Sequence, residues 1–318
     1  MTVWGHGGSL TAGLSRGWVG RLAMVWLLLM VVIALGRNLL ANDRPLVLHD
    51  ERGWSLPALT GGPLTERAED AFMIPAPVAH SPNAVRVERR LERPSRTHPM
   101  GTDELGRDVL ARMIHGTAVS LAIGAAAAGI ALILGSLLGA LAGYYGGLLD
   151  WLISRSIEVL VCFPFIFLVL ALIALFRPSV MTLILALGLT SWTTEARLVR
   201  GEFLRLREME FTQAARASGA RDWRIIGRHL MPNAIAPVIV LASFGVGSAI
   251  LVESALSFLG LGVPLPTASW GSILSAADDY MGHAWWLALF PGLAIFGTVV
   301  ACNVVGESIR GSLNPRGE

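Results

Sequence analysis

The stretch TAVSLAIGAAAAGIALILGSLLGALAGYYGGLL, residues 117–149, runs for 33 residues without a charged side chain. A helix needs about 20 apolar residues to cross the hydrocarbon core of a bilayer, so this stretch is long enough to span one. Gly143 to Gly147 are turn-like, and we expect the helix to end there. The stretch therefore predicts a membrane-spanning helix, and with it an all-α integral membrane protein.

The composition of the whole chain supports this interpretation. Of its 318 residues, 53% are hydrophobic and 15% are charged, and the mean hydropathy is +0.59; a soluble domain carries about 25% charged residues. The net charge of +2 is too small to argue for nucleic acid as a partner, and membrane lipid is expected instead. Cys162 and Cys302 lie in apolar runs without a CxxC pattern, so we expect small buried hydrophobes and neither a metal site nor a disulfide.

The chain contains no lysine, and all 25 of its basic residues are arginine. A P-loop needs a lysine to reach the β- and γ-phosphates of ATP, so a standard P-loop is excluded and any ATP chemistry belongs to another chain. The context G-x-S-x-G is missing around Ser154, Ser179, Ser191 and Ser243, and no HExxH is present; both patterns are common hydrolase signatures. We therefore predict a non-catalytic subunit with no catalytic residue, metal or cofactor of its own.

Further apolar stretches free of charge extend the membrane prediction. They are Leu22–Gly36, Val159–Phe176, Pro178–Thr194, Leu230–Val252 and Ala284–Gly306. We interpret the first as a retained anchor and the next two as a tight helical hairpin. Ser254–Ala277 is also uncharged, but glycines and prolines interrupt it, so we expect a loop or a re-entrant segment there. The sequence thus predicts six transmembrane helices.

The arginine distribution predicts the orientation. The loop from Glu195 to His229 holds eight arginines, and short loops rich in arginine stay in the cytoplasm. Residues 37–116 hold eleven and would face outward, which is allowed because long loops translocate largely regardless of charge. We expect a multi-pass protein of the bacterial plasma (inner) membrane with both termini in the cytoplasm. The expected domains are 1–41 (N-terminus and first span), 42–98 (extracytoplasmic segment) and 99–318 (transmembrane domain with a cytoplasmic loop at 195–232).

The segment 42–98 is rich in proline and has few long apolar runs. Val47–His49 and Trp54–Leu56 are candidates for short strands. We expect a small extracytoplasmic subdomain between the first two spans, and disorder is the alternative for such a composition.

The loop EMEFTQAARASGARDWRIIGRHLMPN, residues 208–233, predicts two short helices. Gly219 suits the left-handed position that ends the first of them. In the second, Trp223, Ile226 and Leu230 recur at helical spacing and form an apolar face, and Pro232 suits the start of the next membrane helix. The residues alone leave open an amphipathic helix that lies on the membrane and meets anionic head groups with its arginines.

The same loop resembles the EAA loop of binding-protein-dependent ABC permeases, whose pattern is E-A-A-x3-G-x9-I-x-L-P. In register with it are Gln213, Ala214, Ala215, Gly219 and Pro232, with His229 and Met231 at the isoleucine and final leucine places. Gln213 stands where the family has glutamate. The resemblance implies a coupling helix that docks into a groove of an ATPase subunit.

Three further stretches resemble the C-type subunit of the oligopeptide, dipeptide and nickel permeases. They are HPMGTDELGRDVL (98–110), ESALSFLGLG (253–262) and the ending GESIR (306–310) with NPR (314–316). The first carries the family signature residues Gly101, Thr102, Asp103, Gly106, Arg107 and Asp108. The resemblance covers about residues 95–316.

What this resemblance implies is the permease fold of a type I ABC importer. The chain would pair with a second, homologous permease subunit, with two ABC ATPase domains that bind ATP and Mg, and with an extracytoplasmic peptide-binding protein. The implied activity is ATP-driven import of di- or oligopeptides, and nickel import is the alternative within the family.

Single residues allow separate expectations. Thr102 or Asp103 could cap the helix after the first signature, and Asp108 suits the dipole at its start. Glu253 abuts an apolar run, so it either lines a translocation pathway or lies at the outer interface. For Asp278, Asp279 and His283 a solvated loop is favoured over a metal site, because their spacing matches no ligand motif.

Two other classes of function compete with the importer. A secondary carrier driven by an ion gradient usually shows intramembrane carboxylates and internal repeats; Glu253 is the one plausible carboxylate here, and no repeat is evident. A membrane-anchored scaffold would leave the three signature stretches as coincidence.

Overall fold

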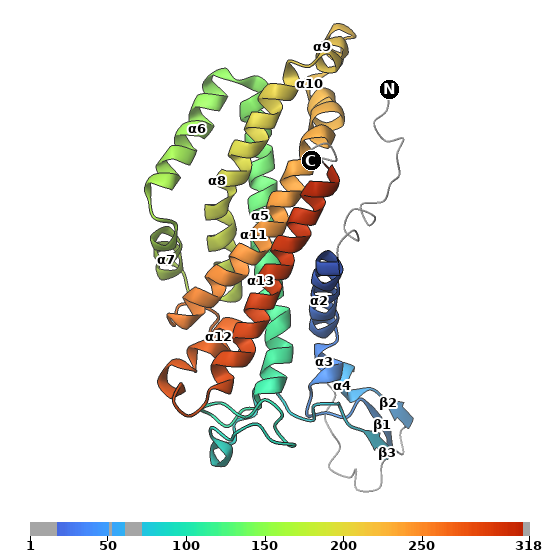
Figure 1. Ribbon diagram of the computed structural model, residues 1–318, viewed down its shortest axis with the longest axis vertical. Helices are drawn as coiled ribbons and strands as arrows, with labels where there is room; N and C mark the ends of the chain where they lie inside the picture. Colours follow the sequence, from blue (N-terminus) through green and yellow to red (C-terminus); the bar gives the residue numbers. More distant parts are fainter. Residues whose placement is uncertain (1–17, 51–52, 61–71, 314–318) are drawn as a thin grey trace. The chain divides into compact units, whose positions relative to one another are not determined.

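The computed structural model describes residues 18–50, 53–60 and 72–313 (Figure 1). Arg16 of the expected cytoplasmic N-terminus and residues 314–316 of the C-terminal motif lie outside the described residues. Contacts divide the chain into two compact units: unit 1 is Met1–Val25, Gly124–Ala249 and Val299–Glu318, and unit 2 is Trp26–Ile123 and Ile250–Thr298.

Long apolar helices dominate the chain, as the composition predicts. They are α2 (Trp18–Leu35), α5 (Val109–Tyr145), α11 (Met231–Phe258) and α13 (Trp286–Leu313). Among the described residues, four helical stretches are long and apolar enough to cross a membrane. The expectation of an all-α membrane protein is confirmed, and α5 ends at the predicted glycine turn, where Gly146 and Gly147 adopt positive φ.

The predicted continuous helix Val159–Phe176 is wrong. The structure has two helices there, α6 (Gly147–Cys162) and α7 (Phe165–Leu175), which meet at a bend of 90°. Pro164 explains the break, because proline forces the preceding residue away from the helical region and lacks an N–H to continue the ladder; Phe163 accordingly has an extended ψ of 134°.

The helix α8 (Val180–Arg207) follows, and the side chain of Ser179 caps it by accepting a hydrogen bond from the N–H of Thr182 at 3.0 Å. Counting the bent pair as one span raises the apolar candidates in the described chain to five. The helix α8 contains the sixth predicted span. It is not among these apolar candidates, because its C-terminal half is rich in charged residues. The count of six spans stays a prediction.

Unit 1 is organised around the contact between α5 and α8, which lie side by side (Figure 1). Gly135, Gly139 and Gly143 repeat at four-residue spacing on α5. A Cβ on Gly139 would lie 2.5 Å from the carbonyl oxygen of Ala196, and one on Gly143 would lie 2.6 Å from the Cβ of Phe203. Because only glycine fits such an approach, these positions bring the two backbones together.

The segment after α8 forms α9 (Glu210–Ala217), α10 (Asp222–Arg224) and a π-helical turn η4 (Ile225–Leu230) that continues into α11. As predicted, Pro232 lies in the first turn of the next long helix, α11, but no loop precedes this helix, because η4 continues directly into it. Pro232 has no N–H to donate, and the ladder widens just before it: the N–H of Met231 bonds the carbonyl of Ile226, five residues back. A π turn of this kind accommodates a lost donor.

Unit 2 contains a small antiparallel sheet. The central strand β1 (Val47–Asp50) pairs with β2 (Gly53–Ser55) on one side and β3 (Phe72–Ile74) on the other. Two short helices, α3 (Arg37–Leu40) and α4 (Pro57–Thr60), flank β1 and β2 along the chain. The two predicted strands are confirmed, with β1 one residue longer than expected and β2 shifted by one residue toward the N-terminus; the extracytoplasmic location of this sheet stays a prediction.

The segment Ser254–Ala277, expected to be a loop or a re-entrant segment, is helical near both of its ends. The helix α11 continues to Phe258, because the first interrupting glycine is Gly260, which adopts a φ of +77° and terminates it. A short helix α12 (Trp270–Ser275) then begins with a capping box between Ser269 and Ser272. Two 3-10 turns, η3 (Val87–Arg89) and η5 (Asp278–Tyr280), complete the elements of the described chain.

Candidate functional site

The segment between α8 and α11 is fastened at its start by two side chains. Thr212 is fully buried, and its hydroxyl donates to the carbonyl of Leu206 at 2.8 Å. The amide of Gln213 donates to the carbonyl of Glu208 at 3.1 Å. Both carbonyls belong to the end of α8, where helical partners run out, so α9 is held where α8 stops.

Gly219 ends α9 as the sequence predicts. Its φ is +76°, its N–H bonds the carbonyl of Arg216 at 2.9 Å, and the N–H of Ala220 bonds the carbonyl of Ala215 at 3.1 Å. This pair of bonds is a Schellman motif, which requires a left-handed residue after the helix. No atom lies within 4 Å of where a Cβ would be, so the requirement is conformational and not one of space.

The remaining residues of the predicted motif divide between surface and core. Gln213 and Ala214 are exposed, while Ala215 packs against the core of unit 1. His229 is half-buried in η4 and Pro232 is exposed in the first turn of α11. The structure therefore gathers the motif on α9 and its exit turn, and leaves its last two positions on the helix that follows.

Large apolar side chains are exposed beside the motif. Met209 and Phe211 flank the start of α9, and Trp223 in α10 is 65% exposed. The guanidinium of Arg224 lies 5.6 Å from the centre of a Trp223 ring. A surface of small, apolar and aromatic residues is suited to contact with another macromolecule, and it offers no pairing of nucleophile and base.

Tyr144, at the end of α5, ties this segment to the rest of unit 1. Its hydroxyl donates to Oδ1 of Asp222 at 2.6 Å, and the guanidinium of Arg216 lies 5.1 Å from its ring centre. Nearby, Arg200 of α8 forms a two-pronged ion pair with Asp150 of α6, with 2.7 Å between Nη2 and Oδ2. The sequence interpretation missed these contacts, although the glycine spacing at 135, 139 and 143 signals the helix pair that brings them together.

The signature residues of unit 2 form a compact buried cluster around Asp103, which we call the signature cluster. Asp103 accepts a hydrogen bond from Nε of Arg107 at 2.6 Å and from the backbone N–H groups of Leu105 and Arg107 at 2.9 Å. Nε of Arg112 lies 3.4 Å from the same carboxylate. Asp103 is 2% exposed, so one buried carboxylate is shared by two buried arginines, and Arg107 has a second partner in Glu104 at 3.0 Å.

Asp108 is the residue that caps α5. Its Oδ1 accepts the N–H of Ala111 at 2.7 Å, which is the geometry of an N-cap, so the expectation that Thr102 or Asp103 caps this helix is wrong. Thr102 closes a turn instead: its hydroxyl oxygen accepts the N–H of Glu92 at 2.8 Å and its hydroxyl donates to the carbonyl of Arg89. The carboxylate of Asp103 is paired with Arg107 and Arg112 and does not cap α5.

Two glycines of the signature cluster are required by the backbone. Gly101 has a φ of +74° and Gly106 a φ of +70°. A Cβ on Gly106 would lie 1.8 Å from the carbonyl oxygen of Arg86, and one on Gly101 would lie 2.8 Å from that of Glu92. All six predicted signature residues thus meet in one turn.

His98 joins the same cluster. Its Nδ1 lies 2.8 Å from Oδ2 of Asp108, and Nη1 of Arg89 lies 3.1 Å from its Nε2. Because arginine can only donate, Nε2 accepts and the ring proton lies on Nδ1, where it bonds Asp108. The ring of His80 stacks on His98 with 4.7 Å between centroids.

His80, His98 and Asp108 form the one group of the described chain whose ligand atoms could meet around a metal ion. The donor set fits a cation poorly, because both ring nitrogens of His98 already have hydrogen-bond partners and Arg89 brings a positive charge to one of them. The expectation of no metal site stays a prediction.

Glu253 is enclosed by hydroxyl groups. It is 0% exposed in α11, and its Oε1 accepts hydrogen bonds from Ser257 at 2.7 Å and from Ser269 at 2.8 Å. Ser269 also caps α12, so the carboxyl group joins α11 to the start of α12. Whether Glu253 lines a pathway stays a prediction.

The loop before α13 holds the other acidic cluster of the sequence. Asp278, Asp279 and His283 are exposed, as expected for a solvated loop.

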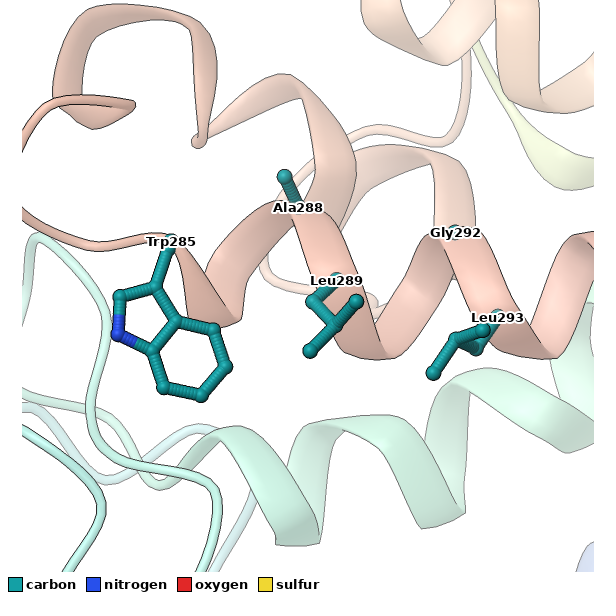
Figure 2. A pocket seen from close by; sticks show the side chains of 5 residues that line it. All are labelled: Trp285, Ala288, Leu289, Gly292 and Leu293. Atoms are coloured by element: carbon teal, nitrogen blue, oxygen red, sulfur yellow. The ribbon is translucent and has the colours of Figure 1, made fainter.

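A shallow apolar groove lies along the first turns of α13 (Figure 2). Its volume is about 450 Å³ and its lining is Trp285, Ala288, Leu289, Gly292 and Leu293. The side chains of Trp285, Leu289 and Leu293 extend to the same side of the helix. A ligand site normally adds a few convergent polar groups to orient its ligand, and this lining has none beyond an indole N–H.

Comparison with known proteins shows a consistent set of likenesses. The model of the family described as "Binding-protein-dependent transport system inner membrane component" matches residues 135–317. The dipeptide transport system permease protein DppC of Alkalihalophilus pseudofirmus is 42% identical over 227 residues, which cover 71% of this chain and 75% of that protein. The probable D,D-dipeptide transport system permease protein DdpC of Escherichia coli is 37% identical over 266 residues, covering 81% and 89%.

The glutathione transport system permease protein GsiD of Pectobacterium atrosepticum is 40% identical over 229 residues, covering 72% of this chain and 76% of that protein. Among solved structures, a chain of the inward-facing MetNI methionine ABC transporter superimposes with a TM-score of 0.51 over 64% of this chain and 96% of that one, at 18% identity. At that identity the superposition supports the fold alone. The family match covers α8 to α11, and so includes the whole segment described above.

Proposed function

This chain belongs to the family of binding-protein-dependent transport system inner membrane components, and from that premise we propose that α9 and its exit turn couple it to an ATPase. The chain is a multi-pass, non-catalytic permease subunit of a binding-protein-dependent ABC importer. We call residues 208–232 the coupling segment. Its proposed partner is one of two ABC ATPase domains, which bind ATP and Mg.

The geometry of the coupling segment is the observation that carries this proposal. The helix α9 is short, fastened to α8 at one end and closed by the turn at Gly219 at the other. It exposes small residues on one side, and Ala215 packs inward. A helix fastened at both ends can transmit a push to the helices that hold it, which is what a coupling contact requires.

The remaining partners and the cargo complete the proposal. A second, homologous permease pairs with this chain, and an extracytoplasmic binding protein delivers di- or oligopeptides. The names of several relatives support peptides over nickel as cargo, since those proteins are described as transporting dipeptides and glutathione. The coupling segment faces the cytoplasm, as do both termini.

The test replaces Gly219 with valine in the complete importer, reconstituted in liposomes with its binding protein. A β-branched residue strains the left-handed conformation, so we expect ATP-driven peptide uptake to fall at least about tenfold with membrane insertion unchanged. Gly201→Val is the matched control, because Gly201 lies in α8 outside the coupling segment, with open space and no positive φ. Uptake by Gly219→Val at the wild-type rate overturns the assignment.

Orientation is tested separately with a cysteine at the exposed position 214. The background carries Cys162→Ser and Cys302→Ala, since Cys162 is itself exposed. We expect Ala214→Cys to react with a membrane-impermeant maleimide only after the inner membrane is opened. Reaction in intact spheroplasts would place the segment outside and refute the coupling role.

A further inference from the structure

We infer that Tyr144 is a positioning residue that locks the coupling segment to the C-terminal end of α5, so that a push on α9 and α10 is delivered to α5. This inference rests on the proposed function and adds a defined route to it. Tyr144 is the penultimate residue of α5 and is 6% exposed. A single side chain there contacts both short helices, through Asp222 of α10 and Arg216 close to the end of α9.

A push on α9 reaches α8 through the chain itself, but it reaches α5 only through contacts in the folded protein. The helix α9 follows α8 in the chain and is fastened to it by Thr212, so α8 must follow any displacement of α9. Tyr144 and Asp222 are 78 residues apart in sequence, and α5 can follow only through contacts made in the folded protein. Among the described residues, the hydroxyl of Tyr144 makes the side-chain hydrogen bond from α5 to α10.

The packing of α5 on α8 makes such a lock necessary. At Gly135, Gly139 and Gly143 the contact face of α5 consists of backbone. The glycine positions allow close approach, but they carry no side chains that interdigitate with the neighbouring helix and fix the register of one along the other. At the end of this face Nη1 of Arg207 donates to the carbonyl of Gly143 at 3.2 Å. The directional hydrogen bond of Tyr144 to the charged acceptor Asp222 adds a constraint that reaches α10.

The neighbouring residue shows that the position of the hydroxyl matters. Tyr145 packs edge to face against Tyr144 with 5.0 Å between ring centroids, yet it is 49% exposed. Its hydroxyl forms no hydrogen bond with the described residues. The two tyrosines are adjacent and chemically identical, and one of them reaches the coupling segment.

The experiment measures ATP hydrolysed per peptide imported by the complete importer in liposomes. For Tyr144→Phe we expect this ratio to rise about tenfold, the factor that corresponds to one hydrogen bond to a charged acceptor. Tyr145→Phe is the matched control and should leave the ratio unchanged. Asp222→Ala should match Tyr144→Phe, whereas Asp222→Asn, which keeps an acceptor oxygen, should restore most of the coupling.

Two outcomes separate this inference from the function on which it rests. A wild-type ratio in Tyr144→Phe, with Gly219→Val uncoupled, overturns the role of Tyr144 and leaves the coupling segment in place. A double variant Tyr144→Phe/Asp222→Ala that is worse than either single variant also overturns it, because residues acting through one bond are not additive. If Tyr144→Phe does not assemble, the ratio of Asp222→Ala against Asp222→Asn decides: equal ratios refute the inference.

Discussion

The two ends of α5 are held by opposite means. At its N-terminal end the signature cluster is closed to water, with Asp103, Arg107, Asp108 and Arg112 all buried. At its C-terminal end the polar partners of Tyr144 are exposed, and in the nearby pair the side chains of Asp150 and Arg200 keep 21% and 34% of their accessible surface. Both ends use carboxylates and arginines in similar numbers.

The difference teaches where this chain can adapt. Removing one partner from a buried ion pair leaves an uncompensated charge, at a cost of about 3–5 kcal/mol, whereas an exposed pair contributes about 0–1 kcal/mol. The signature cluster therefore holds one geometry, whereas the exposed ion pair of Asp150 and Arg200 at the coupling end costs little to break. We expect mutations to separate the two ends by the size of their effect on stability.

Asp103→Ala should have the largest effect. It leaves Arg112 buried without its ion-pair partner and Arg107 with Glu104 alone. We therefore expect a loss of about 3–5 kcal/mol in the free energy of unfolding, seen as a lower yield of folded protein and a lower Tm in detergent. Glu104→Ala is the control, because the ion pair of Glu104 among the described residues is with Arg107 and its side chain is 26% exposed. Equal stability of the two variants would contradict a closed cluster.

Glu253→Leu should come second. It removes the acceptor of two buried serine hydroxyls, at about 1 kcal/mol or more each, so we expect a loss of about 2–3 kcal/mol by thermal unfolding. Glu253→Gln keeps an acceptor oxygen and should retain most of the stability. If leucine is tolerated as well as glutamine, the hydroxyl contacts do not hold α11 to α12.

Gly139→Ala tests the backbone contact that holds the coupling end. Its Cβ would meet the carbonyl oxygen of Ala196 at 2.5 Å, and the forced shift should cost about 1–2 kcal/mol. Gly129→Ala on the same helix has open space and should be neutral or slightly stabilising. A neutral Gly139→Ala, measured by the same unfolding assay, would show that α5 and α8 are loosely packed.

Asp150→Ala should have the smallest effect, at most about 1 kcal/mol, because the partly exposed Arg200 can turn to water. The difference from wild type should shrink further as ionic strength rises. A loss as large as that of Asp103→Ala would erase the distinction between the two ends.

Features that depend on composition or on one residue's conformation could be predicted from the sequence. The long uncharged stretches predict α2, α5, α11 and α13, because lipid sets the requirement for each helix separately. Gly219 predicts the end of α9, since few other residues adopt its φ. The motif residues of the coupling segment were identified by resemblance, and the structure brings most of them together.

Features that depend on the partner of a side chain could not be predicted. Asp103 was a candidate cap for α5, but in the fold its carboxylate pairs with two arginines, and Asp108 caps the helix instead. The bond from Tyr144 to Asp222 joins residues that no local pattern relates. The bend at Pro164 could not be predicted from the absence of charge in Val159–Phe176, because hydropathy takes no account of backbone hydrogen bonds.

The bend between α6 and α7 sets a condition on its surroundings. A helix ends with up to four carbonyls, and begins with up to four N–H groups, that its own ladder cannot satisfy, and the Phe163–Pro164 junction places one such end against one such start. In hydrocarbon each unsatisfied group costs several kcal/mol. This junction must therefore meet water, lipid head groups or another protein chain. Its depth in the bilayer depends on solvation of the backbone, although the side chains from Val159 to Phe176 are all apolar.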